Sequence, residues 1–95
     1  MGDHRFEYNT RAIRELLVAA YSTDELRALV ADDDELDPLR HEFAPSDAIM
    51  NLADRTIDFC LRYLLMDRLL NLVQGGRPAQ YERFEGRLRR DRGDG

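Results

Sequence analysis

The stretch SDAIMNLADRTIDFCLRYLLMDRLLNLVQ, residues 46–74, decides the fold because it is the most apolar part of a chain of 95 residues. Its apolar residues form two stripes at helical spacing, which predicts a helix buried on more than one side, as at the centre of a bundle. The first stripe contains Ile49, Ala53, Ile57, Cys60 and Leu64, and the second contains Leu52, Phe59 and Tyr63.

The length of this stretch predicts that it is broken in two. A single helix would extend about 43 Å at ~1.5 Å per residue. A compact domain of this size has a radius of gyration near ~12 Å, so it cannot contain such a rod. We therefore predict a break around Leu64 to Asp67, although neither glycine nor proline marks it.

Capping residues predict two helices before the long stretch. Asn9 is a typical N-cap, and an apolar stripe follows it at helical spacing. Ser22 and Glu25 have the spacing of a capping box, so the second helix is expected to begin at Thr23. Carboxylates near a helix C-terminus oppose the helix dipole, so the acidic run from Asp32 to Glu35 predicts where this helix ends.

Proline, glycine and capping residues predict the boundaries of the remaining helices. Together with the two helices above they give six helices joined by short links, which is an all-α fold. The expected boundaries are Asp37 as the N-cap before Pro38, Ser46 or Asp47 as the N-cap of the long helix, Gly75 as the residue that ends the next helix, and Pro78 as the start of the last one.

Length and composition predict one small domain with an adequate core. We expect an N-terminal arm over 1–8, a helical domain over 9–90 and a disordered tail or linker over 91–95. The single Cys60 cannot form an internal disulfide, and no apolar run approaches the ~20 residues of a membrane span. The first residues lack the apolar core of a signal peptide, so a cytoplasmic location without membrane contact is expected.

Charge is distributed unevenly along the chain. The net charge is −5, which disfavours nucleic acid as a partner because phosphate binding needs a cationic surface. Residues 22–58 contain eleven acids and three arginines, whereas residues 59–95 contain five acids and eight arginines. Such opposite charges can pair neighbouring helices within one molecule or complementary faces of two molecules.

No group of residues has the pattern of an active site or a metal site. Cys60 with His41 could be a thiol and its base, but Cys60 lies on an apolar helical stripe, where a thiol is usually inert packing. The acidic run over 32–37 lacks the glycine and the terminal glutamate of an EF-hand. We therefore predict no catalytic residue, no cofactor and no metal, and a protein that is not an enzyme.

The stretch ELLVAAYSTDELRAL, residues 15–29, resembles the effector-associated domains of bacterial conflict systems, which belong to the death-like superfamily of six-helix bundles. Their pattern is an apolar helix, an aromatic residue with Ser or Asn, two acids, Leu-Arg and another Leu. The later MDRLLNLV, residues 66–73, followed by Arg77-Pro78, is similar as well, so the resemblance covers residues 10–80. The matching residues are Tyr21, Ser22, Asp24, Glu25, Leu26, Arg27 and Leu29.

This resemblance implies a compact antiparallel six-helix bundle of the death-like fold. It also implies a non-enzymatic adaptor that recruits an effector, such as a protease or an NTPase, through like-with-like contacts in bacterial defence or regulated cell death. Where family members often have a glycine-containing turn before the long helix, this chain has FAPS, residues 43–46.

Two surfaces are candidates for protein binding. An acidic face and a basic complement on another copy would make a heterologous contact, which can propagate into a homo-oligomer or filament. Equally, the acids could be a solvated helix end and the arginines could form internal salt bridges. The alternative function is a generic helical dimerisation or scaffold domain with an apolar face at Tyr81, Phe84 and Leu88. The predicted charged contact residues are Asp33, Asp34, Glu35 and Asp37 on one face and Arg62, Arg68 and Arg77 on the other.

Overall fold

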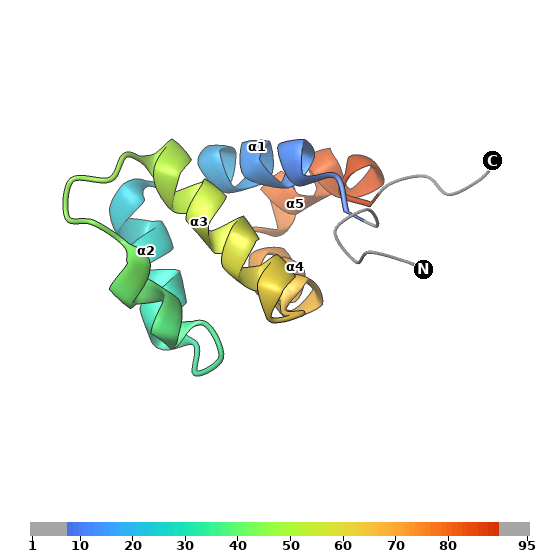
Figure 1. Cartoon of the computed structure of the whole chain (residues 1–95). Helices are drawn as coiled ribbons and strands as arrows, with labels where there is room; N and C mark the ends of the chain where they lie inside the picture. Colours follow the sequence, from blue (N-terminus) through green and yellow to red (C-terminus); the bar gives the residue numbers. More distant parts are fainter. Residues whose placement is uncertain (1–7, 90–95) are drawn as a thin grey trace.

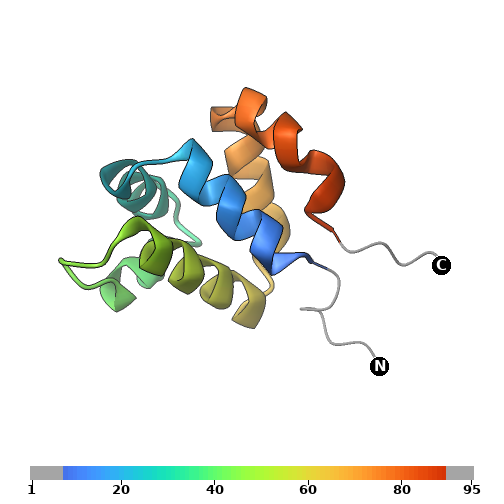
Figure 2. The same cartoon turned by 90° about the horizontal axis from the view of Figure 1, so that it is seen from above.

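A computed structural model describes residues 8–89 as an all-α bundle (Figures 1 and 2). The all-α prediction is confirmed, and the six predicted helices follow one another in the predicted order. The arm over 1–7 and the tail from 90 onward lie outside the described residues. The elements are α1 (Thr10–Ala20), α2 (Thr23–Asp32), the 3₁₀ helix η2 (Asp37–Glu42), α3 (Ile49–Arg62), α4 (Met66–Gly76), α5 (Pro78–Phe84) and the 3₁₀ turn η3 (Glu85–Arg87).

The first two helices begin at the predicted caps. The Asn9 side chain accepts a hydrogen bond from the backbone N–H of Ala12 at 3.1 Å. Ser22 and Glu25 form both bonds of the capping box, at 3.2 Å and 2.9 Å. These bonds satisfy N–H groups that a helix start leaves without partners, which explains why both helices begin where the sequence predicts.

The predicted break in the long stretch is confirmed between Arg62 and Met66. Leu64 adopts the left-handed conformation with φ of 58°, the only non-glycine residue among those described with positive φ. The Leu65 N–H donates to the Cys60 carbonyl at 2.8 Å, which is the six-to-one bond of a Schellman motif. A leucine therefore occupies the position that usually belongs to glycine.

The two apolar stripes continue only as far as this break. Tyr63 and Leu64 were expected on the buried stripes, but their side chains are 58% and 65% exposed. This prediction is wrong because helical spacing no longer applies where the chain leaves the helix. The other stripe residues are buried, apart from Ile49, which is partly buried against the core.

Three predicted helix boundaries are wrong. Gly75 lies inside α4, whose backbone bonding continues until the Arg77 N–H donates to Val73 at 2.7 Å. Pro78 disfavours a helical conformation in the preceding residue and so ends α4 without a left-handed glycine. The N-cap of α3 is Ala48 rather than Ser46 or Asp47. Asp37 is the first residue of η2 rather than its N-cap.

α1 lies between α3 and α5 (Figure 2). The residues of its apolar stripe are buried in the core. α2 and η2 pack together against the other side of α3 (Figure 1). The radius of gyration is 12.9 Å, close to the value expected for one compact domain. The largest fully buried side chains are Ile13, Leu16, Leu17, Leu26, Leu36, Leu39, Leu52, Met66, Leu69, Leu88, Val30 and Val73.

The two ends of the described chain are joined. The Asn9 N–H donates to the Leu88 carbonyl at 2.9 Å, and Tyr8 and Arg89 form an antiparallel bridge. The Tyr8 hydroxyl also donates to Asp67 at 2.9 Å, and Arg89 pairs with the same carboxylate. Tyr8 was expected in the arm, but it is buried and belongs to the helical domain.

Candidate interaction surface

Asp33, the first of the predicted acidic contact residues, is buried. Its carboxylate accepts hydrogen bonds from the N–H groups of Glu35 and Leu36 at 2.9 Å and 3.2 Å. Arg68 Nε lies 2.8 Å and 3.0 Å from its two oxygens. The bond from Arg68 is the main cause of a pKa lowered below the usual value for this carboxyl. Asp33 therefore ties the end of α2 to the first turn of α4.

The other predicted acidic residues lie at the surface around the α2–η2 turn. Asp34 and Glu35 are exposed, and within residues 8–89 neither forms a salt bridge. Asp37 pairs with Arg40 at 2.9 Å. Of the four predicted acids, Asp34 and Glu35 are the two whose carboxylates remain available to a partner.

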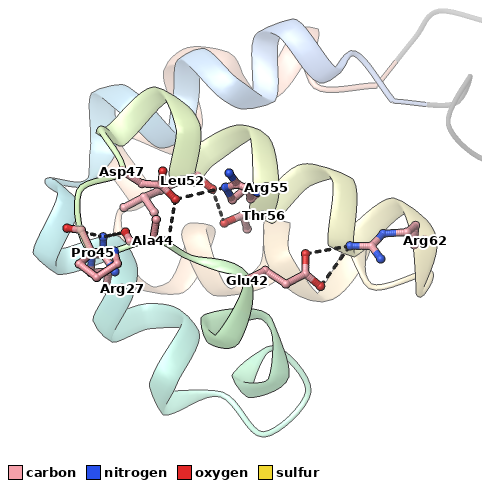
Figure 3. A network of polar contacts seen from close by, with 9 residues as sticks. All are labelled: Arg27, Glu42, Ala44, Pro45, Asp47, Leu52, Arg55, Thr56 and Arg62. Carbon is pink, nitrogen blue, oxygen red and sulfur yellow. Dashed lines mark hydrogen bonds and ion pairs between the residues drawn. The ribbon is translucent and has the colours of Figure 1, made fainter.

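All three predicted basic contact residues bind carboxylates on other elements. Arg62 pairs with Glu42 of η2 at 3.0 Å, which Figure 3 shows, and with Asp58 of α3 at 3.1 Å. Arg68 pairs with Asp33. The acidic and basic parts of the chain are thus joined within one molecule at these positions.

The third predicted basic residue, Arg77, packs on the end of α1. Its Nε donates to the Ala20 carbonyl at 2.9 Å, and its guanidinium lies 4.8 Å from the centre of the Tyr21 ring. It also pairs with Glu25 at 3.3 Å. A role for the predicted charged residues in partner binding stays a prediction, but three of the seven side chains would have to exchange an internal carboxylate for an external one.

A polar network holds the link between η2 and α3 (Figure 3). Asp47 accepts hydrogen bonds from the Ala44 N–H at 2.8 Å and from Arg55 at 3.2 Å. Arg27 of α2 donates to the carbonyl of Ala44 at 2.7 Å. Asp47 therefore stabilises the turn before α3, which explains why its side chain is not the N-cap of that helix.

Cys60 lies in the core and has no exposed surface. Burial, with a smaller effect from the charge of Asp33, raises the pKa of its thiol to about 12. A thiol with such a pKa is protonated at neutral pH, whereas the thiolate is the nucleophile. His41, its proposed base, is exposed on η2. The two residues do not share an open cleft.

Neither a cluster of metal ligands nor a membrane-spanning helix is found among the described residues. Residues 8–89 contain no group of three His, Cys, Asp or Glu side chains placed to hold a metal ion. No described helix is long and apolar enough to cross a membrane.

Within residues 8–89, three large apolar side chains are exposed, and all lie at the two ends of α3. Met50, in its first turn, is 49% exposed, and Tyr63 and Leu64 follow its last residue. Sequence reasoning missed all three as surface residues. The exposure of Met50 could have been predicted, because Met50 lies beside the apolar stripe of α3 rather than on it.

A shallow hollow of about 400 Å³ lies beside Met50, between α1 and α3. Ala19 is exposed and Val18 half-buried within it. The residues that line it are Arg11, Arg14, Glu15, Val18, Ala19 and Met50, and we call this site the α1–α3 hollow.

The apolar face predicted on the last helix is not an exposed cluster. Leu88 is 2% exposed and lies in the core. Tyr81 and Phe84 are partly buried against the same core. The prediction is wrong because α5 ends at Phe84 and the chain turns through η3, so Leu88 is directed by a turn rather than by helical spacing.

Comparison with protein-family models, with curated proteins and with solved structures finds no match to this chain. The resemblance to effector-associated domains over residues 10–80 therefore stays a prediction from the sequence, as does the death-like form of the bundle.

Proposed function

We propose that this chain is a non-enzymatic protein-interaction module, an adaptor that joins copies of a like domain. The observation that carries the proposal is the exposure of Met50, Tyr63 and Leu64 at the two ends of one helix. Exposed apolar side chains are unremarkable when they are scattered singly. Here one of them, Leu64, also makes a left-handed turn in which a leucine costs more free energy than a glycine would.

The resemblance of residues 10–80 supports a finer form of this proposal. Effector-associated domains are adaptors, and the adaptor function would here recruit an effector, such as a protease or an NTPase, in bacterial defence or regulated cell death. The effector would bind through its own copy of the domain. Proteins are thus the partners that we propose, and the module itself acts in the cytoplasm.

The first test is whether the chain associates with itself and whether salt weakens the contact. Light scattering over a concentration series, at low and high ionic strength, measures both. If Asp34 and Glu35 contact a basic surface, association falls at high salt because exposed charges are screened. Replacing both by Arg should then abolish it. Asp33 has to remain intact in this experiment, because its carboxylate is part of the fold.

The second candidate is a generic dimerisation or scaffold domain that uses apolar surface and has no role in defence. It is favoured by the internal pairing of Asp33, Arg62 and Arg68, which leaves less charge for a partner. Association through apolar side chains persists at high salt and is unchanged by Asp34→Arg with Glu35→Arg. A chain that neither associates with itself nor binds a like domain would contradict both candidates.

A further inference from the structure

Tyr63 and Leu64 form an exposed apolar corner between α3 and α4. The Tyr63 ring packs on Phe59 with ring centres 4.7 Å apart, so it is held against the end of α3. Leu64 is left-handed and 65% exposed. We call these two residues the α3–α4 corner.

Folding alone does not explain the leucine in this corner. A left-handed L-residue costs about 1–2 kcal/mol, and glycine adopts the same conformation without that cost. Most of the leucine side chain gains nothing from burial in return. A strained residue whose side chain is presented to solvent indicates a functional site, because the fold would be served as well or better by glycine.

The α1–α3 hollow has the volume and the apolar lining to receive such a corner. Its apolar side chains come from Val18, Ala19 and Met50, and its volume of about 400 Å³ lies within the ~300–1,000 Å³ of typical ligand sites. It lies beside Met50 in the first turn of α3, whereas the corner follows the last turn. A helix of this length separates the two by about 20 Å at ~1.5 Å per residue. One copy therefore cannot fill its own hollow.

Charge favours the same pairing. Arg11 lines the hollow, and among the described residues it forms no salt bridge. Beside the corner, Arg62 is shared between Glu42 and Asp58, which leaves one negative charge in excess. Arg14 and Glu15 of the hollow are paired with Asp54 and Arg87. Counted with these partners, the hollow has one positive charge in excess and the surroundings of the corner have one negative charge in excess, which favours their contact.

We infer that a second copy of this chain is the occupant of the hollow, and that it inserts its α3–α4 corner. This inference rests on the proposed function and names the contact that would join like domains. Because the corner and the hollow are different surfaces, the contact is head-to-tail and can continue from copy to copy. Because only two side chains insert, we expect assembly to be weak and dependent on concentration.

Two variants separate the two surfaces. Tyr63→Ser with Leu64→Gly removes the corner, and the glycine also relieves the strain. Ala19→Arg fills the hollow at an exposed position in the last turn of α1, where a cation is compatible with the helix dipole. The matched control is Ala31→Arg, the same change at an exposed position in the last turn of α2.

Sedimentation velocity of the wild-type chain and each variant provides the test. Wild type and Ala31→Arg should form larger species as concentration rises, whereas the corner variant and Ala19→Arg should each remain monomeric. An equimolar mixture of the corner variant and Ala19→Arg should form a one-to-one complex and nothing larger. The corner variant retains an intact hollow, and Ala19→Arg retains an intact corner. Circular dichroism should show both variants folded.

Each other outcome overturns the inference. If wild type associates and both variants associate equally well, the docking contact is wrong and the proposed function stands. A mixture that stays monomeric excludes head-to-tail insertion. If wild type itself stays monomeric up to millimolar concentration, the docking contact is wrong, and only binding to a like domain of another protein would support the proposed function.

Discussion

At its first end α4 follows a left-handed leucine, and at its last end it contains two glycines in ordinary helical conformation. Leu64 has φ of 58°, whereas no described glycine has a positive φ. Gly75 and Gly76 are the last two residues of the helix, and a Cβ added to Gly75 would meet nothing within 4 Å. Glycine can adopt a left-handed conformation freely. It is nevertheless absent from the left-handed turn before α4 and present at the end of α4, where the backbone is helical.

The two ends also differ in how they are held. At the first end, Arg68 binds Asp33, and Asp67 binds both Tyr8 and Arg89. At the last end, Arg77 donates to the Ala20 carbonyl, pairs with Glu25 and packs on Tyr21, whose buried hydroxyl has no hydrogen-bond partner among the described residues. Polar contacts therefore hold both ends, but only the last end includes a buried hydroxyl without a partner in residues 8–89. The following predictions break or sharpen this contrast, from the largest expected effect to the smallest.

Asp33→Ala should weaken the first end most. It removes the acceptor of two backbone N–H groups and leaves Arg68 without its carboxylate, so the free energy of unfolding should fall by about 2–3 kcal/mol. Urea denaturation followed by circular dichroism measures this change. Asp34→Ala, next in the chain but exposed and without a salt bridge, is the control and should change stability by less than ~0.5 kcal/mol.

Acid should weaken the same end. The pKa of Asp33 is lower in the folded chain than in the unfolded one, where it is about 3.9. Its contribution is complete above the unfolded pKa and is lost as the pH falls through the folded pKa. The wild-type chain should therefore lose more stability than Asp33→Ala when urea midpoints are compared between pH 6 and pH 3. Parallel loss in the two chains would contradict a stabilising role for this carboxylate.

Exchanging Ala for Gly should have opposite signs at the two ends. At residue 64 both replacements remove the leucine side chain, so they differ mainly in strain, and Leu64→Gly should be more stable than Leu64→Ala by about 1 kcal/mol. Paired thermal or urea unfolding curves give this difference. Equal stability of the two variants would show that the left-handed turn is not strained in solution.

Tyr21→Phe tests the last end of α4. The variant removes a buried hydroxyl that lacks a partner, so stability should rise by roughly 0.5–1 kcal/mol. Tyr81→Phe is a suitable control because that side chain is only partly buried. A loss of stability in Tyr21→Phe, measured by urea unfolding, would mean that the hydroxyl has a partner in solution.

Gly75→Ala should have the smallest effect and completes the contrast. The position is helical and open, so alanine should raise the free energy of unfolding by about 0.5 kcal/mol, less than the full ~1 kcal/mol of a helix interior because the helix ends nearby. Gly76→Ala is the variant to compare with it, because the added Cβ would lie 3.7 Å from the Tyr21 hydroxyl, whereas at Gly75 it would meet nothing within 4 Å. Destabilisation by Gly75→Ala would indicate a left-handed end of α4 in solution.

Much of the fold could be predicted because it depends on neighbours in the chain. The Asn9 cap and the Ser22–Glu25 capping box involve residues three apart, and both form as predicted. The break after Arg62 followed from length alone, since a compact domain cannot contain so long a rod. The glycine rule failed at Gly75 because Pro78 ends the helix by itself, whereas the last helix begins at Pro78 as predicted.

The candidate surface could be predicted only in part. Charge runs identified Asp34 and Glu35 as exposed acids, but the same runs included Asp33, which is buried. Only a fold that brings residue 68 next to residue 33 can separate a structural carboxylate from a surface one. The exposure of Tyr63 and Leu64 could not be predicted for a similar reason, because helical spacing placed both residues in the core.

The sequence by itself determined an all-α chain, the order of its helices, two of their caps and the need for a break in the long apolar stretch. These features follow from periodicity, capping and length, which act over a few residues. Only the tertiary structure decided that Asp33 pairs with Arg68, that Leu64 makes the turn and is exposed, and that Met50 lines a hollow on α1. Those outcomes depend on which distant surfaces meet, and such contacts are set by the packing of the whole bundle rather than by the local pattern.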